Sequence, residues 1–162
     1  MRTLSKGFFV VAGLLSPAPM IDSATLTPLY FEEDPRLVRV REFFLAYDSP
    51  AYALADEFLH AADANDLDWR LLPAISLIES GGGKEYRRNN ILGWANGRKR
   101  FSSVRAGIHA VASQLANSDL YRDKNAEGIL RTYNTSRVYS RKVLSLMETL
   151  GPAKFPAGGA LN

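Results

Sequence analysis

Apolar residues recur at every third or fourth position along most of this chain, which is the spacing of one face of an α-helix. Two helix-start signals are explicit, because Asp34-Pro35 and Ser49-Pro50 each place a capping side chain before a proline in the first turn. The pattern predicts helices over residues 35–47, 50–64, 69–80, 126–133 and 137–150, and one that starts after Ser102 or Ser103 and includes Val104 to Leu115.

One stretch in the middle of the chain departs from the helical pattern. Gly81-Gly82-Gly83 ends the helix over residues 69–80, because glycine readily takes the left-handed conformation that closes a helix. Residues 91–95 and 98–102 then flank Asn96-Gly97, a pair that favours the tight two-residue turn of a β-hairpin. We therefore expect a mainly α, α+β fold, in which one small β-hairpin is inserted after the helix over residues 69–80.

The two ends of the chain differ in composition from the helical part. Two basic residues precede a short apolar run at residues 7–15, and small residues follow, as in an export signal. We expect residues 1–24 to be such a segment and the protein to be exported, to a periplasm, the cell wall or the outside. A buried N-terminal helix is the alternative. Residues 28–150 would then form the domain, and residues 151–162, rich in glycine, proline and alanine, a flexible tail.

Composition excludes several classes of function. The 162 residues suit one domain, and the absence of cysteine excludes disulfides, zinc–thiolate sites and cysteine catalysis. His60 and His109 have no partner at metal-ligand spacing, which argues against a metal centre and against a Ser-His-Asp triad. No apolar run approaches the ~20 residues that a membrane span needs. We expect a monomer with no cofactor, no metal and no stable membrane span.

Glu79 is the residue that most requires an explanation. It follows Leu72 by seven positions and Ile75 by four, so it lies on the apolar face of its predicted helix, in the last turn. Burial and the negative end of the helix dipole both disfavour a charged carboxylate there, so the pKa of Glu79 should rise. A carboxyl group that stays protonated near neutral pH can act as a general acid. The alternative is a buried Glu that only forms a hydrogen bond within the core.

Positive charge is concentrated in the segment after Glu79. Residues 84–105 contain seven basic side chains and one acidic side chain, a net charge of +6, whereas the whole chain has +3. This concentration favours an anionic partner, although a solvated hairpin edge would carry similar charges. Aromatic and amide side chains are interleaved here, which suits a sugar chain or a single-stranded nucleic acid. The candidate binding residues in this segment are Tyr86, Asn90, Trp94 and Arg98.

Several motifs together resemble the bacterial endo-β-N-acetylglucosaminidase family, whose members are lysozyme-like cell-wall glycosidases. They are ESGGGK at residues 79–84, NNILGW at 89–94, YNT at 133–135 and YSRKV at 139–143. The stretch LDWRLLPAISLIES at residues 67–80 also resembles the helix that leads into the catalytic Glu of this group. The resemblance covers residues 36–150 and implies a lysozyme-like fold.

The resemblance assigns roles to particular residues. Glu79 would be the general acid, and Tyr133 would match the tyrosine that faces the cleft and helps to bind or orient the sugar. Asn90 would begin the loop over the cleft floor. Tyr139 and Lys142 match the tyrosine and lysine that follow, which favours packing and capping roles for both. Tyr139 is also a candidate substrate-binding residue.

The chain also departs from the family pattern. Gly82 stands where the family often has a bulky aromatic residue, so the wall beside Glu79 is expected to be open. Ser136 and Arg137 replace an Asp-Pro pair. No Asp or Glu occurs between Tyr86 and Ser118, although glycosidases usually use two carboxylates. Two chemistries remain open: attack by the substrate's own N-acetyl group, or internal attack by a sugar hydroxyl as in lytic transglycosylases.

The sequence therefore predicts an exported cell-wall glycan hydrolase that cleaves β-1,4 bonds in polymers of N-acetylglucosamine and N-acetylmuramic acid. Its partner would be peptidoglycan or a related N-acetylglucosamine polymer. The export segment and the modest total charge argue against a nucleic acid. The alternatives are a lytic transglycosylase that forms anhydro ends and a non-catalytic lysozyme-like module that binds peptidoglycan.

Overall fold

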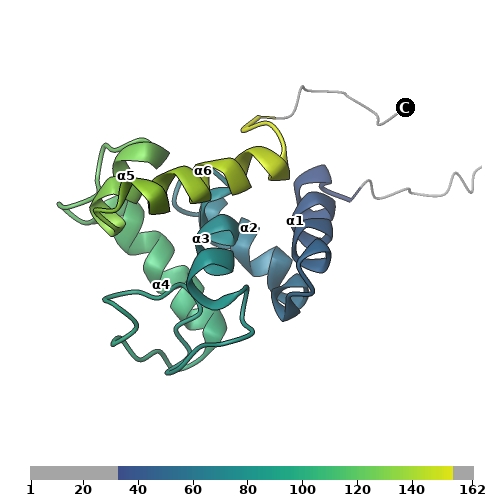
Figure 1. The fold of residues 1–162 in the computed structure, drawn as a ribbon, viewed down its shortest axis with the longest axis horizontal. Helices are drawn as coiled ribbons and strands as arrows, with labels where there is room; N and C mark the ends of the chain where they lie inside the picture. The colour runs from purple at the N-terminus through teal and green to yellow at the C-terminus, as the bar shows by residue number, and fades with distance from the viewer. Residues whose placement is uncertain (1–32, 155–162) are drawn as a thin grey trace, which may run out of the picture. The chain divides into compact units, whose positions relative to one another are not determined.

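The computed structural model describes residues 33–154, and this part of the chain is mainly helical (Figure 1). The elements are α1 (Pro35–Ala46), the 3₁₀-helix η2 (Pro50–Leu54), α2 (Ala55–Asp63), α3 (Leu71–Ser80), α4 (Val104–Asn117), α5 (Ala126–Tyr133) and α6 (Arg137–Leu150). The predicted mainly α class is confirmed, and each predicted helix is present. The stretch predicted as one helix over residues 50–64 begins as a 3₁₀-helix and continues as α2.

Side-chain caps fix where several helices begin. The Asp34 carboxylate accepts a hydrogen bond from the amide of Arg36, and the Ser103 hydroxyl accepts one from the amide of Ala106. The bonds of Asp34 and Ser103 satisfy amide groups that have no partner within the first turn of a helix. The third helix begins at Leu71, two residues later than predicted, and has no side-chain cap, although Asp68 bonds the amide of Arg70 just before it. Short polar motifs in the sequence therefore determine several of the helix starts.

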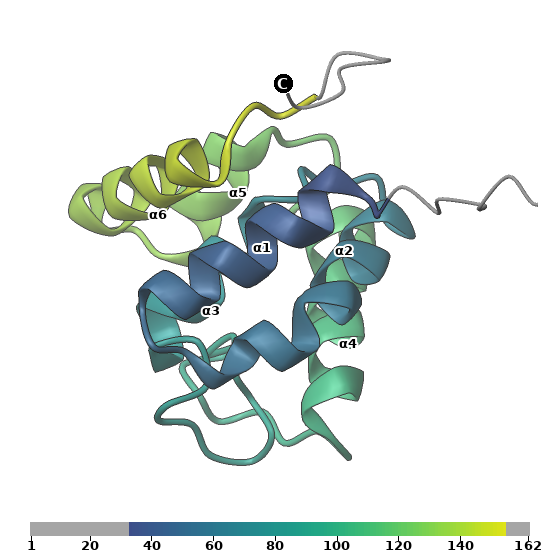
Figure 2. The ribbon, with the colours of Figure 1, turned by 90° about the vertical axis from the view of Figure 1, so that its right-hand side faces the viewer.

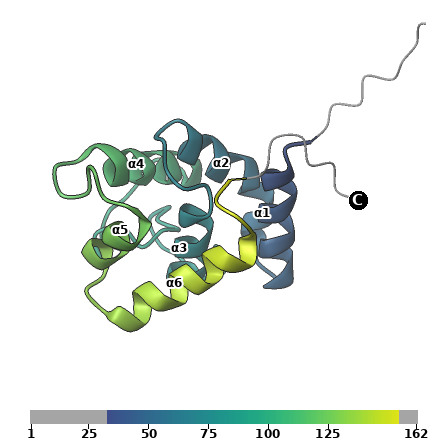
Figure 3. The same cartoon turned by 90° about the horizontal axis from the view of Figure 1, so that it is seen from above.

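The core of the described domain surrounds α3. Figure 3 shows α3 between α2 and α4 on one side and α6 on the other, and α1 packs on η2, α2 and α6 (Figure 2). Residues 71–76 of α3 are all buried, which is typical of a helix enclosed by other elements. Phe44 of α1 and Phe58 of α2 are fully buried, and their rings pack 5.3 Å apart beside α3. Glu79, in the last turn of α3, is thus held by the most buried element of the domain.

The predicted β-hairpin is wrong. Residues 81–103 form a succession of turns, drawn in teal below α3 in Figure 1, and no strand occurs within residues 33–154. Ala95, Asn96 and Gly97 all have left-handed φ angles, of 54°, 54° and 72°, one more than a two-residue hairpin turn contains. The turn is closed by bonds from the Gly97 amide to the Gly93 carbonyl and from the Arg98 amide to the Ala95 carbonyl. The N–H and C=O groups that would form hydrogen bonds between two strands of a hairpin therefore form hydrogen bonds within the turn itself.

Some predictions concern residues outside the described range. The expected export segment at residues 1–24 lies outside it, as do the first residues of the expected domain at 28–150 and residues 155–162 of the expected tail. The start of that tail is anchored, because the carbonyl of Gly151 accepts a hydrogen bond of 2.8 Å from Arg70. Within residues 33–154 no helix combines the length and the apolar character that crossing a membrane requires.

Candidate active site

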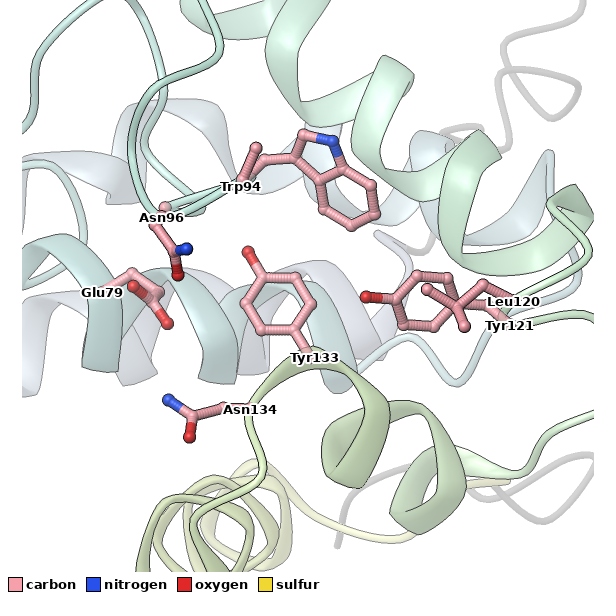
Figure 4. A pocket seen from close by; sticks show the side chains of 9 residues that line it. Glu79, Trp94, Asn96, Leu120, Tyr121, Tyr133 and Asn134 are labelled. Carbon is pink, nitrogen blue, oxygen red and sulfur yellow. The ribbon is translucent and has the colours of Figure 1, made fainter.

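Glu79 lies where two adjoining pockets meet. The first, here called the aromatic pocket, has a volume of about 320 Å³ and is lined by Glu79, Gly93, Trp94, Ala95, Asn96, Leu120, Tyr121, Tyr133 and Asn134 (Figure 4). The second, here called the charged pocket, has about 670 Å³ and is lined by Glu79, Glu85, Tyr86, Arg87, Asn90, Gly93, Asn96 and Gly97. Because the pockets share Glu79, Gly93 and Asn96, we treat them as one groove with space on both sides of the carboxyl group.

The environment of Glu79 favours the protonated carboxyl group. Its side chain is half-buried, and this burial raises the pKa of Glu79 above its ordinary value. The hydroxyl of Tyr139 acts in the opposite direction and lowers that pKa. This hydroxyl is buried and has no hydrogen-bond partner within 3.5 Å, so its interaction with the carboxyl group is long and the effect of burial prevails. The sequence predicts a rise in the pKa of Glu79, and the structure gives a shift in the same direction.

The backbone of Gly93 covers one side of the Glu79 carboxyl group. A Cβ atom at Gly93 would stand 2.2 Å from Oε2 and 2.7 Å from Cδ of Glu79, which is closer than any real contact. The φ angle of Gly93 is 69°, in the left-handed region that favours glycine. Glycine is therefore required at this position for both space and conformation. Gly93 is not a candidate site residue from the sequence, since its motif, NNILGW, shows a glycine but not what that glycine faces.

An aromatic cluster forms the far wall of the aromatic pocket. The ring of Trp94 lies 5.7 Å from those of Tyr121 and Tyr133, and Tyr133 stacks on Tyr139 at 6.2 Å. Figure 4 shows Glu79, Tyr133 and Trp94 around the same space, so the structure brings three predicted site residues together. These distances are typical of favourable aromatic pairs, which hold the wall in one arrangement.

The hydroxyl of Tyr133, the predicted catalytic tyrosine, has a definite partner. It donates a hydrogen bond to the carbonyl of Leu92, in the loop that follows α3. Burial raises the pKa of this hydroxyl, and the nearby charge of Glu79 raises it further. Tyr133 is therefore neutral at ordinary pH. Its bond fixes the position of α5 relative to the loop that carries Gly93 and Trp94.

Asn90 holds the loop together with its side chain. Its carboxamide oxygen accepts from the amide of Trp94, and its nitrogen donates to the carbonyls of Trp94 and Lys99, at 2.9, 2.9 and 3.2 Å. Asn90 is 4% exposed, and its polar atoms have partners inside the protein. It lines the charged pocket, and these bonds show that it also shapes the groove. The substrate-binding role predicted for it stays a prediction.

The remaining predicted binding residues fall in different places. Tyr86 is 44% exposed and lines the charged pocket beside Arg87. Arg98 is exposed on the loop and lines neither pocket of the groove, and Tyr139 is buried behind Tyr133 and lines neither. The groove thus includes Tyr86, Asn90 and Trp94 but leaves Arg98 and Tyr139 outside its lining.

Some groove residues were missed by the sequence analysis. Asn96 lines both pockets, and its carboxamide points toward Glu79 in Figure 4. In the sequence it counts as half of the expected hairpin turn and as one of the interleaved amides, but not as a candidate binding residue. Asn134 follows Tyr133 in the YNT motif, which was a usable signal. Leu120 and Tyr121 lie in the turn after α4, and nothing in the local pattern marks them as neighbours of Glu79.

Two expectations about the surroundings of Glu79 have different outcomes. Gly82 does not open the wall of the groove: it is buried, and a Cβ there would stand 2.0 Å from the hydroxyl oxygen of Ser49. Glu85 is the one carboxylate other than Glu79 among the lining residues of the two pockets, and it is exposed. Within residues 33–154 no group of three or more metal-binding side chains lies together.

Comparison of the chain with protein-family models, with curated proteins and with solved structures finds no match. The geometry of the groove and the sequence motifs are therefore the basis on which a function can be argued.

Proposed function

We propose that this protein is a lysozyme-like glycosidase that cleaves β-1,4 bonds in peptidoglycan, with Glu79 as the general acid. The observation that carries the proposal is the position of Glu79: a half-buried carboxyl group with a raised pKa, between two adjoining pockets. A glycosidic bond is cleaved when an acid protonates the oxygen between two sugars. A groove with space on both sides of one protonated carboxyl group suits that reaction.

The aromatic pocket has the side chains that a sugar ring requires. Trp94, Tyr121 and Tyr133 offer flat apolar surfaces, on which the C–H face of a sugar can pack. Asn96 and Asn134 add carboxamides, which both donate and accept hydrogen bonds to hydroxyl and N-acetyl groups. The combination of aromatic faces and amides in one pocket supports a glycan as the substrate.

Charge supports an acidic glycan. The loop after α3, residues 81–103, has a net charge of +5 and forms one wall of the groove, and Arg87 lines the charged pocket. Peptidoglycan carries the carboxylates of its lactyl groups and stem peptides, and a positive wall raises the local concentration of such a polymer. The same charge and the aromatic faces would also suit a single-stranded nucleic acid, but a half-buried carboxyl group with a raised pKa has a role as a general acid on a glycan and none in binding a nucleic acid.

The residues of the groove suggest how the reaction proceeds. Glu79 gives its proton to the leaving oxygen and then, as a carboxylate, accepts a proton from the group that attacks the anomeric carbon and completes the reaction, which is a water molecule after N-acetyl participation or the sugar hydroxyl group in the internal route. Tyr133 stays neutral and holds the pocket wall beside the reacting sugar. Because Glu85 is exposed, we favour a nucleophile from the substrate, either its N-acetyl oxygen or an internal hydroxyl group. The latter route would make the protein a lytic transglycosylase.

Mass spectrometry of the soluble products from purified peptidoglycan tests the proposal. The parent protein should release fragments, and Glu79→Gln should release none, whereas the control Glu42→Gln, an exposed acid on α1, should behave as the parent. A free reducing end would mean hydrolysis, and a product lighter by one water would mean the transglycosylase route. Release of fragments by Glu79→Gln at the parent's rate would overturn the assignment of the acid.

A non-catalytic peptidoglycan-binding module is the second candidate. It is favoured by one observation, namely that no second buried carboxylate lines the two pockets of the groove. Folded parent protein that sediments with cell walls but releases no product would support this candidate. Sedimentation that persists in Glu79→Gln would then show that binding does not depend on the acid.

A further inference from the structure

Arginines in the described domain are paired with carboxylates, except in two places. Ion pairs bind the arginines of α1, of the segment before α3, of α4, of the turn after it and of α5. The arginines without such a partner within residues 33–154 are Arg87, Arg88, Arg98 and Arg100 in the loop after α3, and Arg137 and Arg141 in α6. The first set lies in the loop that forms one wall of the groove of Glu79, and of its members Arg87 lines the groove. The second set has no part in that groove.

Arg137 and Arg141 line a separate pocket of about 580 Å³ between α5 and α6. Its lining residues are Glu127, Arg131, Arg137, Ser140, Arg141 and Leu144. The other lining residues of α6 follow Arg137 by three, four and seven positions, and the two lining residues of α5 are four positions apart. Each helix therefore contributes residues from one of its faces. The two helices pack against each other, side by side in Figures 1 and 3. None of these residues lines the groove.

The pocket has an unbalanced positive charge. Glu127 is bound to Arg131 at 2.6 Å, so these two side chains neutralise each other. Arg137 and Arg141 remain, one turn apart on the same helix. They also lie in the first half of α6, where the helix dipole is positive and the first turn contains no acid. Two cations therefore repel each other at the end of a helix that itself prefers an anion.

Ser140, which is adjacent to Arg141 on α6, has a hydroxyl group without a partner in the described domain. Ser140 is 5% exposed and lines the same pocket, and its buried hydroxyl has no hydrogen-bond partner within residues 33–154. A buried polar group left unpaired lowers the stability of a protein. A bound oxyanion would neutralise the two guanidinium groups. The Ser140 hydroxyl is closed to solvent, and it can donate a hydrogen bond to that anion once its side chain rotates toward the pocket.

We propose that the pocket between α5 and α6 binds a phosphate group. One guanidinium group can donate two parallel hydrogen bonds to two oxygens of a phosphate group. Two arginines without carboxylate partners also balance the charge of about −1.5 to −2 that a phosphate monoester carries near pH 7. A carboxylate, with one charge, would leave one of them uncompensated. The pocket has the volume of a small-molecule site. A soluble phosphate ester fits this concave pocket better than a flat membrane surface. The proposal does not depend on the glycosidase activity.

Titration of the ¹⁵N-labelled full chain with inorganic phosphate and with glycerol phosphate, at constant ionic strength, tests this site. We expect saturable binding, with chemical shift changes at Arg137, Ser140 and Arg141. The double variant Arg137→Gln/Arg141→Gln should weaken binding by about tenfold or more, since it removes charged hydrogen-bond donors. The control Lys142→Gln removes an exposed neighbouring charge that does not line the pocket, and it should change binding by less than about twofold.

Each other outcome would overturn the assignment. Absence of binding by both phosphates, or equal binding by the double variant and the parent, would exclude the pocket. If the double variant and Lys142→Gln lost the same amount of phosphate affinity, the loss would come from the change in net charge and not from the pocket. Acetate that binds as tightly as phosphate would exclude selectivity for phosphate. Binding only to phosphatidylglycerol vesicles, and not to the soluble phosphates, would replace the pocket by a membrane surface. Glutamine keeps the helix propensity of arginine, so the variants should remain folded.

Discussion

The backbone of Gly93 packs directly against the carboxyl group of Glu79, so that a single methyl group at position 93 would overlap Oε2 at 2.2 Å. The loop after α3 and the acid at the end of α3 are therefore fitted to each other at van der Waals distance. Three residues of this region, Glu79, Gly93 and Asn96, line both pockets. Any displacement of the loop would change the space on both sides of the acid.

Substitution of Gly93 by alanine should displace Glu79 and abolish the activity proposed for the groove. The left-handed φ costs alanine about 1–2 kcal/mol, and the overlap with the carboxyl group adds about 1–3 kcal/mol of strain. Gly97→Ala is the matched control for backbone strain, since Gly97 has a φ of 72° and no atom within 4 Å of its Cβ position. Because Gly97 lines the charged pocket, the two variants are compared by thermal unfolding, in which Gly93→Ala should lose more stability. Peptidoglycan cleavage is measured for Gly93→Ala against the parent. Equal losses of stability in the two variants would mean that only backbone strain matters.

Removal of the Tyr139 hydroxyl group should change the titration of Glu79 without loss of stability. This hydroxyl lowers the pKa of Glu79, so Tyr139→Phe should raise that pKa, and the alkaline limb of the activity profile should move to higher pH. The hydroxyl has no close partner, and its loss should leave the free energy of unfolding unchanged or slightly increased. Activity against pH and chemical denaturation provide the two measurements. An unmoved alkaline limb would show that Tyr139 is a packing residue only.

The helices were predictable from the sequence because their signals are local. Capping side chains such as Asp34 and Ser103 act within two or three residues, and the apolar period reports which face is buried. The site residues Glu79, Trp94 and Tyr133 could also be selected, because each lies in a motif that is recognisable in sequence. Their joint position in the aromatic pocket follows from the fold and from no single motif.

The loop after α3 could not be predicted, because its conformation depends on bonds across the loop. Asn96-Gly97 is typical of a hairpin turn, but the Asn90 side chain bonds Trp94 and Lys99 and closes the loop on itself. Tyr121 reaches the groove because α4 carries it there, and no local pattern reports a distance set by tertiary packing. The loop and the far wall of the pocket are thus properties of the whole fold.

The stability of the protein should depend on pH through Glu79. Its pKa in the folded state is raised above the ordinary value of 4.5, so the folded state holds this proton more tightly than the unfolded chain. The stabilisation is fully present below pH ~4.5 and is lost as the pH rises through the pKa of the folded protein. Relative to the parent, Glu79→Gln should therefore become more stable as the pH rises above ~4.5. Urea unfolding of both proteins at a series of pH values measures this difference, and a constant difference would show that Glu79 titrates normally.

Two asparagines of the loop should respond to substitution in opposite ways. Asn90→Ala removes three hydrogen bonds and leaves the amide of Trp94 and two carbonyls without partners, which should cost about 2–4 kcal/mol of stability.

Asn96 is exposed, with a left-handed φ, so Asn96→Gly removes its carboxamide and keeps the backbone conformation. We expect Asn96→Gly to leave the unfolding temperature within a few degrees of the parent's and to weaken the binding of N-acetylglucosamine oligomers. Calorimetry of unfolding and titration with chitin oligosaccharides would separate the two effects. If Asn96→Gly bound these oligomers as the parent does, the carboxamide seen beside Glu79 would have no part in recognising the glycan.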